Sequence, residues 1–231
     1  MYRNEFDQNK FAVLRNFFNI KHVERMAKRM MFLKQTNNLI FDDQCPLSSS
    51  IYSDTVNSEY QELYRNKLET LIGYSIYPTY NYCRIYSPKE VLERHSDRPS
   101  CQISITATLD YNTFDDEPWD LYVEPDIKIK LYPGDALVYK GCEIEHWREK
   151  FIGIYQTQVF MHYVDANGPY AECKYDFRSN LSASSFEKNA ESERIFLEKL
   201  NESNSKQETI RASDNKGPLQ QRRTKTNVER N

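Results

Sequence analysis

The first seventy residues carry the hydrophobic spacing of two amphipathic helices. In the first, from Lys21 to Lys34, apolar residues recur every three or four positions: Val23, Met26, Met30 and Leu33. In the second, from Val56 to Ile72, the repeating residues are Tyr60, Tyr64, Leu68 and Leu71. This spacing puts the apolar side chains on one face of each helix, and Gly73 is placed to end the second. The apolar run 11–17 predicts an opening strand, and the polar stretch 37–53 predicts a loop.

Beyond Gly73 the period changes from that of helices to that of strands. Tyr82, Arg84 and Tyr86 alternate with other residues and are expected on one face of a strand. Further strands are expected at residues 102–109, 121–123, 127–131, 136–139 and 157–164. Many short strands preceded by two helices predict an α+β fold, in which helices pack outside a jelly-roll or barrel.

This pattern divides the chain into four parts. Residues 1–75 form an N-terminal strand and helices that pack on the core, and residues 76–180 form the β core. Residues 181–204 have the spacing of a C-terminal helix. In residues 205–231 apolar side chains nearly vanish and basic ones gather, so this tail is expected to be disordered.

Composition excludes several classes of function. The net charge of −3 over 231 residues argues against a nucleic-acid partner, and only six glycines argue against a phosphate-binding glycine loop. Five dispersed cysteines without a Cys-x-x-Cys pair indicate a reduced, cytoplasmic protein. Neither a signal peptide nor an apolar run of membrane-spanning length is present, so no membrane association is expected. The sequence does not indicate an oligomeric state.

Two histidines and an aspartate form the strongest candidate for a chemical site. His95 and Asp97 are two residues apart near the end of a strand, so both side chains are expected on the same side. His146, which follows the turn at Gly134-Asp135, supplies a third ligand. Two imidazoles and one carboxylate hold non-haem Fe(II) and leave positions open. The competing interpretation is that these are structural histidines and that His-x-Asp is a chance surface pair.

These residues, taken together, resemble a known family. Arg84-x-Tyr86, Pro88, His95-x-Asp97, Gly134-Asp135 and His146 occur in the order found in Fe(II)- and 2-oxoglutarate-dependent dioxygenases, nearest the prolyl-4-hydroxylase-like branch. The resemblance covers roughly residues 75–165. It implies a double-stranded β-helix, Fe(II) as cofactor, and 2-oxoglutarate and O2 as co-substrates. It also implies that oxidative decarboxylation of 2-oxoglutarate is coupled to hydroxylation of a C–H bond.

The resemblance assigns roles to individual residues and also shows one departure. His95, Asp97 and His146 match the iron ligands, and Tyr86 matches a tyrosine that contacts the co-substrate. Where the family has an Arg or Lys about ten residues after the second histidine, this chain has Gln156 and Gln158. A buried dicarboxylate needs a cation, so another basic residue is required. Candidates are Arg84 first, since it shares a face with Tyr86, and then Arg98, Lys140 and Arg148.

Three functions are compatible with this constellation. The first is hydroxylation of a peptidyl or free amino-acid side chain, with proline as the first substrate to consider by analogy with the family. The second is oxidative demethylation of a nucleobase, which the acidic loop 115–117 and the negative net charge disfavour. The third is a catalytically silent, cupin-like jelly-roll that binds a metal or small ligand. The absence of an Arg or Lys about ten residues after His146 supports it.

Overall fold

The computed structural model describes residues 2–184 and 188–214, and the chain forms two units. The first unit, residues 1–189, holds both β-sheets, and the second, which begins at Ala190, holds α4. The helices are α1 (Tyr2–Asn9), α2 (Ile20–Gln35), α3 (Thr55–Ile72) and α4 (Ala190–Asp214), with short 3-10 helices η1 (Pro99–Cys101) and η2 (Ala171–Phe177). None of the helices within 2–184 and 188–214 is long and apolar enough to cross a membrane.

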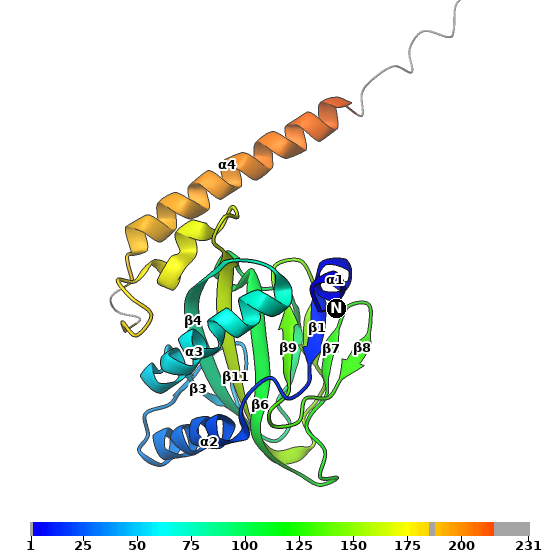
Figure 1. The fold of residues 1–231 in the computed structure, drawn as a ribbon, viewed down its shortest axis with the longest axis vertical. Helices are drawn as coiled ribbons and strands as arrows, with labels where there is room; N and C mark the ends of the chain where they lie inside the picture. Colours follow the sequence, from blue (N-terminus) through cyan, green and yellow to red (C-terminus); the bar gives the residue numbers. More distant parts are fainter. Residues whose placement is uncertain (1, 185–187, 215–231) are drawn as a thin grey trace, which may run out of the picture. The chain divides into compact units, whose positions relative to one another are not determined.

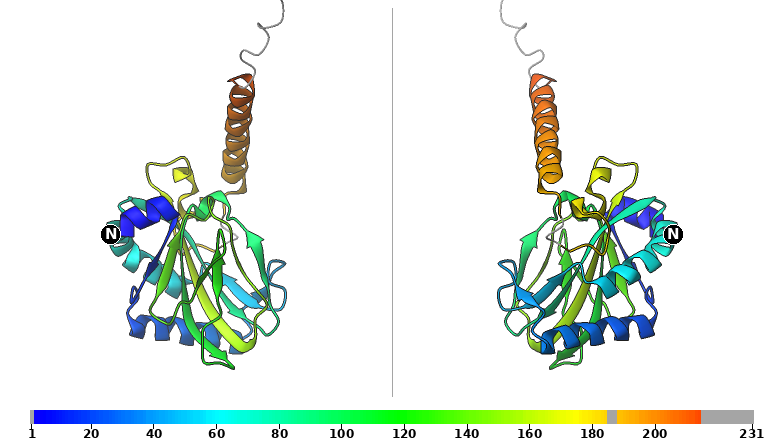
Figure 2. Two further views of the ribbon diagram at one scale, coloured as in Figure 1. Left: turned by 90° about the vertical axis from the view of Figure 1, so that its right-hand side faces the viewer. Right: turned by 90° about the vertical axis from the view of Figure 1, so that its left-hand side faces the viewer.

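Two antiparallel sheets form the first unit. The larger has the strand order β1 (Phe11–Leu14), β9 (Ala136–Tyr139), β6 (Ile103–Thr113), β11 (Gly153–Asp165), β4 (Ile76–Tyr86), β3 (Ser49–Tyr52) and β2 (Ile40–Phe41). The smaller has the order β5 (Leu92–His95), β10 (His146–Arg148), β7 (Leu121–Val123) and β8 (Ile127–Ile129). Figures 1 and 2 show α2 and α3 along one face of the larger sheet.

The two faces of the larger sheet differ in chemistry. On β6 the odd residues are apolar and belong to the core shared with the helices: Ile103, Ile105, Ala107 and Leu109. The even residues on the opposite face are buried and polar: Ser104, Thr106 and Thr108. β11 repeats this pattern, with Val159, Met161 and Tyr163 in the core and Gln156, Gln158 and His162 on the other face. The polar face therefore lines the interior between the sheets, where a ligand can be bound.

The predicted helices α2 and α3 are confirmed within one residue at each end. Asn19 caps α2 by accepting a hydrogen bond from the Lys21 amide at 2.9 Å. Asp54 caps α3 in the same way through the Asn57 amide at 3.2 Å. Gly73 ends α3 with φ +75°, a left-handed conformation that favours glycine.

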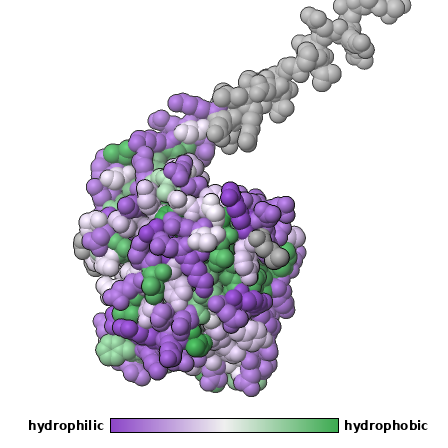
Figure 3. Space-filling model, in the orientation of Figure 1, coloured by the Kyte–Doolittle hydropathy of each residue, from purple (hydrophilic) through white to green (hydrophobic). Residues whose placement is uncertain are grey.

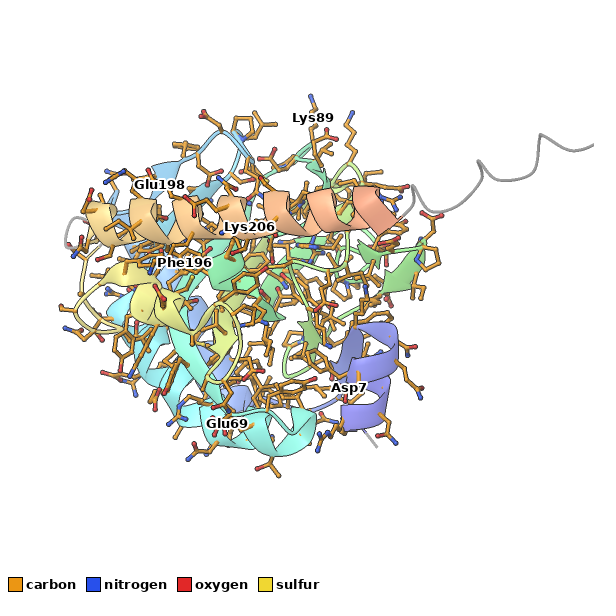
Figure 4. The ribbon with its side chains drawn as sticks, turned by 90° about the horizontal axis from the view of Figure 1, so that it is seen from above. Asp7, Glu69, Lys89, Phe196, Glu198 and Lys206 are labelled. Atoms are coloured by element: carbon orange, nitrogen blue, oxygen red, sulfur yellow. The ribbon has the colours of Figure 1, made fainter. Side chains whose placement is uncertain are left out.

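Helix α1 was not predicted, because its eight residues lack a helical apolar repeat. It is held by tertiary contacts: Phe6 is fully buried against Tyr74, with ring centroids 6.1 Å apart. The Tyr74 hydroxyl also donates to Asp7 at 2.7 Å. Figure 4 labels Asp7 on α1 and Glu69 on α3, and Glu69 accepts a hydrogen bond at 2.9 Å from the first residue of β4. Packing rather than helix propensity therefore stabilises this short helix.

Three predicted segments differ from the structure. The predicted loop 37–53 contains β2 and β3, which pair with each other and extend the larger sheet. The predicted C-terminal helix 181–204 is displaced, because α4 begins at Ala190. It also continues to Asp214, so residues 205–214, predicted to be disordered, are helical. This stretch is polar, but it contains neither Gly nor Pro to end a helix. The rest of the predicted tail, 215–231, lies outside the described residues.

Polar side chains also characterise the surface and α4. Figure 3 shows a mainly hydrophilic face with scattered hydrophobic residues, as expected for the solvent side of helices that pack on a sheet. On α4, Arg194 pairs with Glu191 at 2.6 Å and with Glu198 at 2.6 Å. The two residues of each pair are about one helical turn apart, so these ion pairs stabilise the helix locally.

Candidate active site

The two predicted histidine ligands lie side by side on the smaller sheet. His95 is the last residue of β5, His146 is the first residue of β10, and the two are direct partners across the antiparallel pair. Their ring centroids are 4.4 Å apart. Asp97 follows two residues after His95, and its Oδ1 lies 3.8 Å from His95 Nε2 and 3.7 Å from His146 Nε2. The structure therefore brings together three groups from two segments of the chain, one at residues 95–97 and the other at His146.

Backbone carbonyls select which nitrogen of each histidine faces this centre. His95 Nδ1 lies 2.6 Å from the carbonyl of Glu93, and His146 Nδ1 lies 3.3 Å from the carbonyl of Ile144. A carbonyl only accepts hydrogen bonds, so Nδ1 carries the proton and Nε2 keeps its lone pair. Burial lowers the pKa of His146, which also favours the neutral ring. Two imidazole nitrogens and a carboxylate oxygen within 4.8 Å of one another form a ligand set suited to a divalent metal.

A pocket of about 400 Å³ opens beside this centre. Its walls come from the loop after β2, from β4, from the β5 to η1 segment and from β9, β10 and β11: Asp42, Gln44, Tyr80, Tyr82, Arg84, Tyr86, Leu92, His95, Ser96, Asp97, Arg98, Cys101, Tyr139, His146, Phe160 and His162. Tyr82, Arg84 and Tyr86 all line it, which confirms the prediction that they share one face of a strand. A volume of this size suits a small ligand.

Tyr86, which lines the pocket, and Arg148, which is not among its lining residues, each contribute a buried polar atom without a hydrogen-bond partner. The Tyr86 hydroxyl, the Arg148 Nε and also the Arg84 Nε are fully buried and have no partner among the described residues. The Arg148 guanidinium carbon lies 5.9 Å from the centre of the Tyr86 ring. Burial lowers the pKa of Arg148 and raises that of Tyr86. Tyr86 and Asp120 offset only part of the effect of burial on the pKa of Arg148, so an anion bound here would stabilise the buried cation.

Arg84, the first candidate for the co-substrate cation, is already paired. Its Nη2 donates to both carboxylate oxygens of Asp42, at 2.9 and 2.8 Å. Hydrogen bonds from Tyr82 and Arg84 lower the pKa of Asp42 to about 2 against the opposing effect of burial. Arg84 also donates to Gln44 Oε1 at 3.1 Å, and Gln44 Nε2 lies 3.3 Å from His95 Nε2. The pocket therefore contains a chain of polar contacts from Asp42 to the metal-facing nitrogen of His95.

Two of the three other candidate cations are also paired with carboxylates. Arg98 makes two hydrogen bonds to Asp176, at 2.7 and 2.8 Å. Lys140 lies 3.9 Å from Asp7, over the rings of Phe6 and Tyr74. Arg148, the last of the four candidates, has no carboxylate within ion-pair distance in the part of the chain that the structure describes. The ion pairs in the structure therefore change the order of the candidates for the co-substrate cation, and Arg148 moves from last to first.

Gln156 and Gln158 point into the interior but bond to their own surroundings. Gln158 donates to Thr106 at 2.7 Å and accepts from Thr108 at 3.1 Å. Gln156 accepts from the Trp119 amide at 2.7 Å. Neither is among the pocket-lining residues. Their assignment as co-substrate contacts stays a prediction, and these contacts favour a supporting role.

Several pocket residues were not identified from the sequence. Asp42 and Gln44 lie in the segment predicted as a loop, and no local pattern indicates that they reach Arg84. Ser104 could have been found, because the apolar and polar alternation on its strand places it opposite the core. Ser104, Cys101 and His162 surround the outer side of Asp97, and Asp97, Cys101 and His162 form a second possible ligand group. The candidate centre therefore has a competing set that shares its carboxylate.

Comparison with known proteins gives structural likeness only. No family model matches the chain, and no curated protein matches it. A prolyl-4-hydroxylase from Pseudomonas putida superposes with a TM-score of 0.59 at 12% identity, over 71% of this chain and 97% of that one. A prolyl hydroxylase from Trichoplax adhaerens, in complex with a hypoxia inducible factor peptide, gives 0.58 at 15%, over 71% and 88%. HygX from Streptomyces hygroscopicus, with nickel and 2-oxoglutarate bound, gives 0.57 at 12%, over 72% and 87%.

These likenesses define the class of fold. The first unit has the double-stranded β-helix of the Fe(II)- and 2-oxoglutarate-dependent oxygenases, with helices flanking the sheets. The predicted fold class is confirmed, and prolyl hydroxylases are among the structures that share this fold.

Proposed function

We propose that this protein is an Fe(II)- and 2-oxoglutarate-dependent dioxygenase. The observation that carries the proposal is the convergence of His95 Nε2, His146 Nε2 and Asp97 Oδ1, with both Nδ1 atoms held on backbone carbonyls. Three ligands on one side of the ion leave positions for a bidentate keto acid and for O2. When bound, these cofactors oxidise a C–H bond: one oxygen atom enters succinate as CO2 leaves, and the other enters the product hydroxyl.

The buried polar atoms beside the metal centre suit the distal carboxylate of 2-oxoglutarate. Arg148 follows His146 by two residues on β10, so both side chains point to the interior. We assign Arg148 as the main cation for this carboxylate and Tyr86 as its hydrogen-bond donor. Arg84 becomes available only if Asp42 leaves it. This assignment gives a partner to the unpaired Arg148 Nε and Tyr86 hydroxyl.

The substrate is proposed to be a peptidyl or free amino-acid side chain, with proline first to be tested. Tyr80, Tyr82 and Phe160 present aromatic faces to the pocket, and Arg84 and Arg98 are already neutralised by aspartates. Such walls suit a neutral, largely apolar group better than a charged one. The same pairing of cations disfavours a nucleic-acid substrate, whose phosphates require free basic side chains.

Anaerobic titration with Fe(II) and 2-oxoglutarate tests this function directly. Chelation of the metal by the keto acid is expected to give a weak visible charge-transfer band in the wild-type protein. His95→Ala should abolish the band, whereas His22→Ala should preserve it, because His22 bonds to Tyr64 outside the pocket. Absence of the band from the wild type at saturating ligand would remove the support for the dioxygenase.

A catalytically silent metal-binding jelly-roll remains the second candidate. It is favoured by one observation: the strand positions about ten residues after His146, where the family carries a cation, hold Gln156 and Gln158, and the Gln158 amide is satisfied by Thr106 and Thr108. This candidate predicts metal binding without 2-oxoglutarate binding. The same titration with Co(II) in place of Fe(II) separates the two functions. Co(II) binding without a response to 2-oxoglutarate would favour the silent protein.

A further inference from the structure

The side of Asp97 that faces away from the histidines is closely surrounded. Its Oδ1 faces His95 and His146, and its Oδ2 lies 3.4 Å from Ser104 Oγ. The Asp97 amide donates to the carbonyl of Gly141 at 2.8 Å, so the backbone of Gly141 lies against this residue. Asp97 is thus restrained at two points, through its backbone amide and through its carboxylate oxygen Oδ2.

Gly141 leaves no room for a side chain at this position. A Cβ built on Gly141 would lie 2.4 Å from Asp97 Oδ2 and 2.4 Å from the carbonyl oxygen of Cys101. Both distances are far below van der Waals contact, and the second atom belongs to the backbone. Gly141 is therefore required by close approach rather than by an unusual φ.

Ser104 connects Asp97 to a buried histidine. Its Oγ lies 2.8 Å from His162 Nδ1 and 3.1 Å from the Cys101 carbonyl, in addition to its contact with Asp97. With the His162 proton on Nδ1, Ser104 accepts from Nδ1–H, and its own single proton is shared between the Cys101 carbonyl and Asp97 Oδ2, which only accept. The His162 Nε2 then keeps its lone pair. Burial lowers the pKa of His162 to about 4, which keeps the ring neutral near pH 7.

We propose that Gly141 and the Ser104–His162 pair are positioning residues that aim Asp97 Oδ1 at the metal. The proposal rests on the proposed function, because it requires a metal held by His95, Asp97 and His146. Gly141 acts by leaving space for the carboxylate, and Ser104 acts by restraining Oδ2. His162 orients the Ser104 hydroxyl from the other side. Partners of this kind typically change metal affinity 10–100-fold when they are removed.

Co(II) titration of the full chain, followed by calorimetry and by the visible Co(II) spectrum, tests this arrangement. Ser104→Ala is expected to weaken Co(II) binding about tenfold, and Gly141→Ala by on the order of a hundredfold. The matched control is Thr106→Val, which also removes a buried hydroxyl on the same face of β6. In the wild type that hydroxyl bonds only to the Val159 carbonyl and the Gln158 amide. That control should bind Co(II) as the wild type does.

His162 variants separate positioning from general damage to the fold. His162→Asn keeps an N–H donor near the position of Nδ1 and should retain near wild-type Co(II) affinity. His162→Leu removes the donor and should weaken binding several-fold, by roughly half of the Ser104→Ala effect on a logarithmic scale. Both variants replace the same buried ring, so a purely structural role of His162 would lower the Co(II) affinity of both equally.

The outcomes distinguish this inference from the function on which it rests. Ser104→Ala and Gly141→Ala variants that bind Co(II) as tightly as Thr106→Val overturn the inference and leave the metal site intact. A sulfur-to-cobalt charge-transfer band also overturns it, because it would place the metal on Cys101 in the competing group. Failure of the wild type to bind Co(II) overturns the proposed function and this inference together.

Discussion

Arg84 and Arg148 are both buried beside Tyr86, but their surroundings are opposite. The Arg84 side chain is 3% exposed and pairs with Asp42 through two hydrogen bonds. Arg148 is 1% exposed, donates to the carbonyl of Trp119, and has no ion pair within the described part of the chain. A buried cation with an internal carboxylate is already compensated, whereas one without it gains most from an external anion.

This difference separates structural cations from binding cations. Burial lowers the pKa of both arginines. For Arg84 the effects of Tyr86, Cys45 and Tyr82, and to a smaller extent of Asp42, outweigh burial and raise the pKa, whereas for Arg148 the effects of Tyr86 and Asp120 do not. The Arg84 pair therefore stabilises the fold and shapes the pocket, whereas Arg148 is left for a ligand. Four changes test how far this distinction holds.

The largest expected effect is the loss of 2-oxoglutarate affinity in Arg148→Gln. Removing one partner of a buried charge pair costs about 3–4 kcal/mol, which corresponds to a decrease in affinity on the order of 10²–10³-fold. Calorimetric titration of the Co(II)-loaded protein with 2-oxoglutarate measures it. Co(II) affinity itself should stay unchanged, because Arg148 is not a ligand. An unaltered 2-oxoglutarate affinity in Arg148→Gln would show that Arg84 is the anchor.

Asp42→Ala is expected to have the next largest effect, this time on stability. It leaves Arg84 buried without its carboxylate, and breaking such a pair costs about 3 kcal/mol of unfolding free energy. Urea unfolding of the metal-free protein measures this loss. Arg148→Gln should show no comparable loss, since its cation has no internal carboxylate to abandon. Equal destabilisation by the two variants would contradict the distinction between the cations.

Acidification should affect the same pair more weakly. The pKa of Asp42 is lowered from 3.8 to about 2, so its stabilising contribution is complete above pH 4 and is lost as the pH falls toward 2. The shift corresponds to roughly 2 kcal/mol at most, because Asp42 is partly exposed. Unfolding curves between pH 5 and pH 2.5 should therefore fall more steeply for the wild type than for Asp42→Ala. Parallel curves would indicate that the Asp42 carboxyl titrates with its ordinary pKa.

Local patterns in the sequence indicated many of the elements but not α1, β2, β3 or the bounds of α4. The assignment of His95, Asp97 and His146 as metal ligands stays a prediction. Helical spacing predicted α2 and α3, and the period of two predicted the inward face that carries Tyr82, Arg84 and Tyr86. The same period places Arg148 on the face of His146, so its inward direction could also have been predicted. These features depend on neighbours a few residues apart, which is the range over which sequence patterns are informative.

Partners from distant segments could not be predicted in this way. Asp42 reaches Arg84 from the β2 to β3 connection, and Asp176 reaches Arg98 from η2. Nothing local to either arginine indicates that a carboxylate will meet it. The ranking of the candidate cations therefore depended on contacts that only the fold supplies. For the same reason Gly141 gave no signal, because its requirement arises from contact with Asp97 across the pocket wall.

The smallest expected effect concerns Gln158, one of the two glutamines near the strand position where the resemblance places a cation. Its amide bonds to Thr106 and Thr108, both buried on β6, so it links the two strands in the interior. Gln158→Met removes these bonds at similar size and should cost about 1 kcal/mol of unfolding free energy. The 2-oxoglutarate affinity should change by less than about threefold, since a neutral amide bound elsewhere contributes little to holding a carboxylate.

Gln158→Arg makes this last prediction sharper. If Arg148 has taken over from the strand position of the family, a cation at 158 should restore 2-oxoglutarate binding in Arg148→Gln when both changes are combined. Calorimetry of the single and double variants would measure the restored affinity, with unfolding curves as the control for folding. Restoration would mean that the two positions reach the same carboxylate from neighbouring parts of the barrel. A folded double variant without restored binding would instead place the carboxylate beyond the reach of β11, nearer to Tyr86 and β10.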